Sequence, residues 1–126
     1  MIVLTLSAYR EHEPDQLGRT AGGWKPGLSD AKVWDNARGR WRLGPEADGH
    51  RYVLVVAGRA ATDKPQVVLA VEIHALLEKD QEGLRAIEGT VLSEGHPVFD
   101  RYLGRQSPVR AYGSGPRYYT SPHIPG

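Results

Sequence analysis

The sequence predicts a mainly β fold of the α+β class: an antiparallel sheet of five or six strands, curled into a small barrel, with two or three short helices. Three observations predict it. Short apolar or alternating runs recur at the length of strands, and turn-forming residues separate them. Two further segments show helical rather than strand spacing. The chain has 126 residues, enough for one domain with its own core, so we expect residues 1–126 to form a single domain.

The first third of the chain predicts a strand, a long loop and a helix. Residues 2–6 are β-branched and aliphatic, as in a strand, whereas residues 10–26 show no period and predict a loop anchored by Trp24. Ser29 is suited to the helix N-cap, and Gly39 to a left-handed residue that ends the helix. Four apolar side chains that follow Ser29 fall on one stripe of a helix: Val33, Trp34, Ala37 and Trp41.

Alternating and continuous apolar runs predict the central strands. Residues 40–43 alternate, so Arg40 and Arg42 are expected on one side of a half-buried strand, opposite Trp41 and Leu43. Turn chemistry, with room for one helical turn, follows at 44–51. Two apolar strands, at 52–57 and 67–74, are then expected to form an antiparallel hairpin.

The last third predicts one more helix and two more strands. Residues 75–84 have the composition of a helical turn, and 86–92 alternate as an antiparallel strand does. Residues 95–103 offer an apolar helical face with Pro97 near its start. Beyond them the chain is rich in Ser, Pro, Gly, Arg and Tyr, with a strand expected at 117–120 and an irregular tail at 121–126.

Composition excludes several classes of protein. There is no cysteine, so disulfides and thiolate metal sites are not available. No apolar run reaches the length of a membrane span, and the first residues lack a basic leader, so we expect a cytoplasmic protein without membrane contact. The formal charge is only +1, but it is unevenly distributed: residues 32–42 carry +3, residues 101–126 carry +4 and residues 71–94 carry −4.

Signals for catalysis, metal or cofactor binding are weak. The five histidines lack the spacing of a helical metal site, and no nucleophile elbow or phosphate-binding glycine loop occurs. We therefore expect no cofactor, no metal and no catalytic residue. The alternative is a small enzyme in which Glu72 and His74, two residues apart on one strand, act as an acid–base pair.

Arginines interleaved with aromatic residues give the strongest functional signal. Planar guanidinium groups grip phosphates, and aromatic rings stack on bases, so this mixture is typical of nucleic-acid binding. Two interpretations remain open, because the tryptophans could equally form the core, with the arginines on a solvated face. A third is a protein-interaction surface, since Trp, Tyr and Arg are enriched in binding hot spots.

Several short motifs resemble the PUA-like superfamily of small β-barrels, which includes the PUA, ASCH, EVE and YTH domains. They look most similar to small domains that accompany restriction-type and GIY-YIG nucleases. The matching segments are residues 37–41, 52–58, 67–73, 87–89, 101–104 and 115–119. The acidic stretch that begins the 10–23 segment departs from the pattern, and acids near a binding mouth would weaken phosphate contacts.

The resemblance implies a binding module for nucleic acid, DNA or RNA, in which a flipped base enters an aromatic pocket. Ser7 and Tyr9, which follow the first strand, would contact the base edge. The pocket walls would be Trp24, Trp34 and Trp41. Phosphates would be held by arginines from the two basic segments: Arg38, Arg40, Arg42, Arg105 and Arg117.

Overall fold

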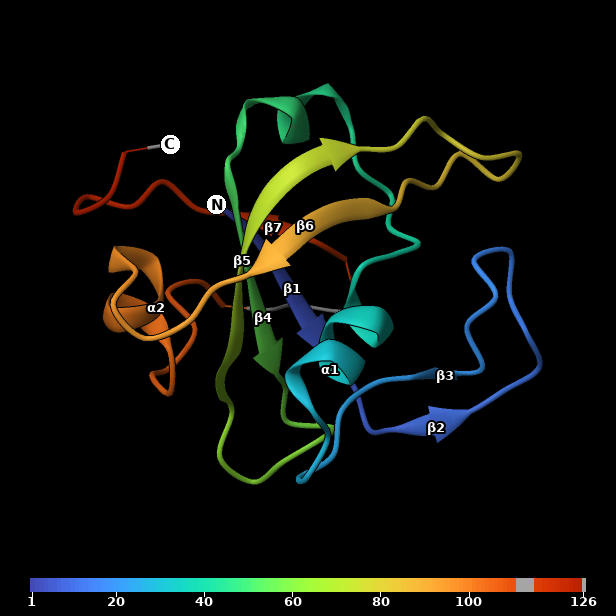
Figure 1. The fold of residues 1–126 in the computed structure, drawn as a ribbon, viewed down its shortest axis with the longest axis horizontal. Coiled ribbons are helices and arrows are strands. Elements are labelled where there is room, and N and C mark those ends of the chain that lie inside the picture. Colours follow the sequence, from blue (N-terminus) through green and yellow to red (C-terminus); the bar gives the residue numbers. More distant parts are fainter. Residues whose placement is uncertain (111–114, 126) are drawn as a thin grey trace.

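The computed structural model describes residues 1–110 and 115–125, which form a mainly β fold around one five-stranded sheet (Figure 1). The strand order is β6-β5-β4-β1-β7. The strands are β1 (Ile2–Leu6), β4 (Tyr52–Ala57), β5 (Gln66–Leu76), β6 (Ile87–Val91) and β7 (Arg117–Tyr118). The segment predicted as a loop instead contains a small antiparallel pair, β2 (Arg10–Glu11) with β3 (Ala21–Gly22).

The sheet is mixed, so the prediction of an antiparallel sheet is wrong at its centre. β1 runs parallel to β4, and the other pairings in the sheet are antiparallel. Parallel neighbours need a crossover connection, and residues 7–51, which contain the first helix, provide it. Among the described strands, β6 and β7 lie at opposite edges without pairing to each other, so these strands do not close a barrel.

The strands predicted at 2–6, 52–57, 67–74 and 86–92 are confirmed with small changes at their ends, and the strand predicted at 117–120 covers only Arg117–Tyr118. The strand predicted at 40–43 is wrong, because this segment crosses the α1 face of the sheet instead of joining it, and only Trp41 makes an isolated β-bridge. β4 and β5 form the expected antiparallel hairpin. β5 continues to Leu76, and residues 75–84 form no helix because the strand and the turn after it occupy that segment. The last described strand pairs with the first, with Val3 opposite Arg117. In the tail, residues 121–125 contain neither helix nor strand, and Gly126 lies outside the described residues.

Helix α1 (Asp30–Ala37) begins as predicted, but Gly39 does not end it through a left-handed residue. The Ser29 side chain accepts a hydrogen bond from Lys32 N at 3.2 Å, which is the expected N-cap. Gly39 does not have the positive φ predicted for it. A Cβ at this position would lie 3.0 Å from Ala86 Cβ and from Leu17 Cδ1, so Gly39 is required for close packing rather than for a left-handed turn.

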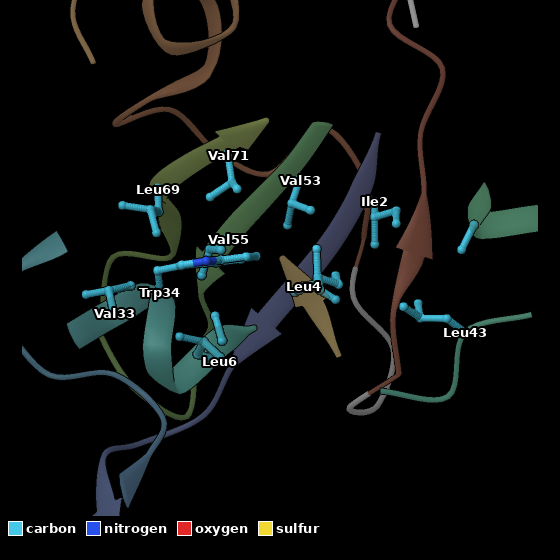
Figure 2. Close-up of a cluster of buried hydrophobic side chains, with 13 residues drawn as sticks. Ile2, Leu4, Leu6, Val33, Trp34, Leu43, Val53, Val55, Leu69 and Val71 are labelled. Carbon is cyan, nitrogen blue, oxygen red and sulfur yellow. The ribbon is translucent and has the colours of Figure 1, made fainter. Parts of the chain in front are cut away.

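The two faces of the sheet carry separate cores. On one face, α1 packs Val33 and Trp34 against inward side chains of β1, β4 and β5. Figure 2 shows the Trp34 side chain extending from α1 over the sheet, among Leu4, Val55 and other aliphatic residues. On the other face, α2 (Pro97–Tyr102) packs Val98 against the opposite side of the strands.

The chain between α1 and β4 joins the two edges of the sheet. Trp41 forms an antiparallel bridge with Arg85, just before β6. The segment continues through the short 3-10 helix η1 (Pro45–Gly49), and His50 then stacks on Tyr118 of β7 with ring centroids 5.2 Å apart. Leu43, only 1 % exposed, points into the core as its predicted alternation requires. Residues 38–50 therefore cover the α1 face from edge to edge.

Candidate ligand-binding site

A pocket of about 310 Å³ lies where the end of β1 meets the end of α1. Its lining includes Ser7, Arg19, Asn36, Arg40, Trp41 and Leu84, and we call it the Trp41 pocket. Trp41 is held in place because its indole Nε1 donates a hydrogen bond to the Ala37 carbonyl at 2.6 Å. One half-buried indole and several polar groups thus face the same space, which suits a small flat ligand.

Arg19 fixes the loop between β2 and β3 to the end of α1. Its side chain is 9 % exposed, and its Nε lies 2.8 Å from the Asp15 carboxylate. Its Nη1 donates to the carbonyls of Asp35, Asn36 and Gly39. The last carbonyls of a helix have no partner within the helix, so one buried guanidinium both satisfies them and builds a wall of the pocket.

Asn36 brings an unused hydrogen-bond acceptor to the pocket lining. Its side-chain nitrogen donates to the Gly23 carbonyl at 3.0 Å, which fixes the orientation of the amide. Asn36 is 4 % exposed, and its Oδ1 is buried without a hydrogen-bond partner. Buried polar atoms are nearly always paired, so the free oxygen marks a place where a ligand N–H group could bind.

Arg40 is held by two carboxylates from the loop between β5 and β6. Its Nε donates to Asp80 Oδ2 at 2.7 Å, and its Nη2 lies 3.1 Å from Glu82 Oε2. The Nη2 atom is buried beside Glu82. Arg40 therefore lines the pocket with its charge already balanced by two carboxylates.

The ion pair between Arg40 and Asp80 predicts a dependence of stability on pH. The Arg40 hydrogen bond, helped by the backbone N–H groups of Leu84 and Glu82, lowers the pKa of Asp80 from 3.8 to about 2. A carboxyl with a lowered folded-state pKa stabilises the fold above its unfolded pKa and loses that effect as pH falls through the folded value. We expect Asp80→Asn to destabilise the protein near neutral pH, and the difference from wild type to shrink between pH 3.8 and about 2.

Urea denaturation of wild type and Asp80→Asn over this pH range checks the prediction. Glu88→Gln is the matched control, because Glu88 is exposed and makes no ion pair with any residue that the structure describes. A difference between wild type and Asp80→Asn that stays constant with pH would show that the carboxylate charge contributes nothing.

The structure brings some predicted site residues to the pocket and keeps others away. Ser7, Arg40 and Trp41 line it. The prediction that Arg40 and Trp41 face opposite sides of a strand is therefore wrong, because residues 40–43 form no strand. Trp34, only 9 % exposed, belongs to the core and is not part of the lining. Trp24 packs on the edge of the same core, and its backbone pairs with the backbones of Ser7 and Tyr9. Trp24 and Tyr9 therefore lie next to the pocket without lining it.

The remaining predicted arginines differ in their surroundings. Arg38 Nε is paired with Asp35 at 2.9 Å. Arg42 is exposed, lies close to Gly83 beside the pocket, and makes no ion pair within residues 1–110 and 115–125. Arg105 is also exposed, but its backbone carbonyl binds Val67 N, at the start of β5.

Arg117 lies along the edge of the sheet rather than at the pocket. It sits opposite Val3 on β1, and its Nη1 donates to the Pro116 carbonyl. Val3 and Ser7 are four positions apart, which corresponds to about 13 Å along a strand. The pairing of β7 with β1 therefore leaves Arg117 outside the pocket lining.

Glu72 and His74, the residues of the acid–base alternative, lie at the surface, and each contacts another residue. His74 Nε2 lies 2.7 Å from Thr90 Oγ1, and Glu72 lies 3.7 Å from Arg51. The register shifts at His74, so the simple two-residue alternation predicted for Glu72 and His74 does not hold there. Within the described part of the chain, no group of three His, Asp or Glu residues could hold a metal ion.

Sequence reasoning missed the two polar residues that define the pocket. Asn36 follows Val33 by three positions and precedes Ala37, so it is a polar residue on the buried stripe of α1, and that pattern could have revealed it. Arg19 gives no such signal, because it lies in a segment without periodicity and reaches its partners only through the fold.

Comparison with known proteins gives no relative for this arrangement. No family model matches the chain, and neither a curated protein nor a solved structure was found to match it. No helix in the described residues is long and apolar enough to cross a membrane. The functional argument therefore depends on the geometry of the site itself.

Proposed function

We propose that this chain is a nucleic-acid-binding module that takes one unstacked base into the Trp41 pocket. The observation that carries the proposal is the free acceptor Asn36 Oδ1 in a pocket walled by an indole. A base presents N–H donors and acceptors at its edge and a flat face for stacking. Asn36 supplies the acceptor and Trp41 the stacking surface, and Arg40 lines the same pocket.

The size of the pocket favours a single ring system over a larger cofactor. At about 310 Å³ it is at the lower end of the range for small-molecule sites. Stacking on an aromatic side chain stabilises a bound base by about 1–3 kcal/mol, which offsets much of the cost of unstacking it. The motif resemblance to PUA-like domains supports the same proposal, and the 38–50 segment would then stand in for a barrel strand.

Arg42 is the best candidate for a phosphate contact. It is exposed next to the pocket and has no carboxylate partner in the described chain, whereas Arg38 and Arg40 are paired with acids. Because each neutralised phosphate of a single strand changes the slope of log affinity against log salt by about −0.7, we expect a shallow but measurable slope of about −1 to −2.

Fluorescence anisotropy with short single-stranded DNA and RNA oligonucleotides tests this function. We expect Trp41→Ala to weaken binding about tenfold, by loss of base stacking, and Trp41→Phe to retain most of it. Arg42→Ala should weaken binding and reduce the salt slope by about 0.7. Arg101→Ala serves as the matched control, because Arg101 is an exposed arginine on α2, which covers the other face of the sheet.

Two results would contradict the proposal. One is the absence of oligonucleotide binding at low salt, where phosphate attraction is strongest. The other is binding that Trp41→Ala leaves unchanged, which would place the nucleic acid elsewhere on the surface. Capture of a protein partner with no salt dependence would instead favour the protein-interaction alternative.

A further inference from the structure

A second pocket, of about 360 Å³, lies on the side of the sheet that α2 covers. It forms where the start of β4 and the start of α2 meet the C-terminal segment. Its lining includes Arg51, Tyr52, His96, Pro97, His123 and Ile124, and we call it the Tyr52 pocket. It shares no lining residue with the Trp41 pocket.

Tyr52 offers a positioned hydroxyl group with nothing bound to it. The residue is 5 % exposed, because its ring packs in the core on the α2 face. Among the described residues, its hydroxyl has no hydrogen-bond partner. The hydroxyl oxygen is also not fully buried. A rigidly held phenol that reaches the pocket can therefore donate to a ligand.

Both histidines of the pocket also present N–H donors. His96 Nδ1 accepts a hydrogen bond from Val98 N at 3.1 Å, so in the neutral ring Nε2 carries the proton. His123 Nε2 faces the Arg101 guanidinium, which can only donate, so in the neutral ring the proton of His123 is on Nδ1. Each ring thus keeps one N–H available.

Arg51 adds a positive charge to the same lining. Its guanidinium lies over the Tyr52 ring at 5.3 Å from the centroid. Its nearest carboxylate, Glu72, is 3.7 Å away, and both side chains are substantially exposed, so the pair is weak. The rest of the lining, including Pro97 and Ile124, is apolar.

We propose that the Tyr52 pocket binds a phosphate monoester with a compact apolar body. Tyr52, His96, His123 and Arg51 all offer donors, and none of the described lining residues carries a carboxylate. A phosphate monoester has three terminal oxygens to accept these hydrogen bonds, and the cation balances its charge. Pro97 and Ile124 cover the organic part. This site is independent of the function proposed for the Trp41 pocket.

Titration calorimetry with phenyl phosphate, inorganic phosphate and benzoate tests the proposal on the whole chain. We expect phenyl phosphate to bind most tightly, inorganic phosphate more weakly and benzoate weakest. Tyr52→Phe removes only the hydroxyl and should weaken phenyl phosphate binding about tenfold, as expected for a hydrogen bond to a charged group. Tyr9→Phe removes a hydroxyl elsewhere and is the matched control.

His96→Asn provides a second variant that keeps the fold. Asparagine retains an acceptor for the Val98 N–H group, but its amide N–H group lies closer to the backbone than His96 Nε2, so the helix cap survives while the donor is withdrawn from the pocket. We expect it to weaken binding with little change in melting temperature. No binding of phenyl phosphate, equal binding of benzoate, or unchanged binding in both variants would overturn the proposal.

Discussion

Replacing Trp34 with alanine is expected to lower the free energy of unfolding by about 4 kcal/mol, the range for deleting a buried tryptophan. Trp34 is 9 % exposed and packs between α1 and the sheet, where Leu4 and Val55 surround it. Removing the indole leaves a cavity that the short helix cannot fill. Urea denaturation followed by circular dichroism measures the loss.

Trp41→Phe is the control for this substitution. Trp41 is half-buried at the pocket, so phenylalanine keeps much of its packing and loses mainly the hydrogen bond to the Ala37 carbonyl. We expect a cost of about 1 kcal/mol, the usual value for one such bond. Equal losses for the two variants would contradict the distinction between a core tryptophan and a pocket tryptophan.

Arg19→Met is expected to destabilise the protein by about 3 kcal/mol, as is typical when one member of a buried ion pair is removed. The substitution leaves Asp15 without its partner and deprives three carbonyls at the end of α1 of a donor. Partial burial works to raise the pKa of Asp15, but hydrogen bonds from Arg19 and Leu17 outweigh burial and lower it.

Arg38→Met is the matched control, because Arg38 is also paired with a carboxylate but is more exposed. Exposed pairs contribute about 0–1 kcal/mol, so this variant should unfold at nearly the wild-type urea concentration. A stability of Arg19→Met similar to that of Arg38→Met would mean that the contacts of Arg19 do not hold the loop to the helix.

The strands and helices could be predicted from the sequence because their signals are local. β4 is apolar throughout and β6 alternates, and Ser29 and Pro97 mark the starts of the two helices. The order of the strands is not local. The parallel pairing of β1 with β4 depends on how α1 crosses the sheet, and no pattern within either strand records that choice.

The candidate site shows the same division. Ser7, Arg40 and Trp41 were predicted from residue type and motif, and they line the pocket. Trp34 has the same residue type but faces the core, because its position on α1 decides its direction. Trp34 and Trp41 are seven positions apart, a spacing that would put both on one face of a continuous helix. They face different surroundings because α1 ends at Ala37, between them, and the chain then changes direction.

Arg40 illustrates a second limit of sequence reasoning. Its neighbours in the sequence are basic and aromatic, which favours an interpretation as a phosphate contact. The fold instead places Asp80 and Glu82 beside it, from a segment forty residues further along the chain. The acidic segment at 71–94 thus neutralises part of the basic segment at 32–42. The expected phosphate contact is therefore Arg42 instead of Arg40.

The indole N–H signals in a ¹H–¹⁵N NMR spectrum test the central claim most directly. Trp41→Phe, which lacks one indole, assigns the Trp41 signal, and the spectrum is followed while a single-stranded oligonucleotide is added. We predict that the Trp41 signal moves as the base enters the pocket and that the buried Trp34 signal stays in place. A saturated complex in which the Trp41 signal does not move would contradict the account.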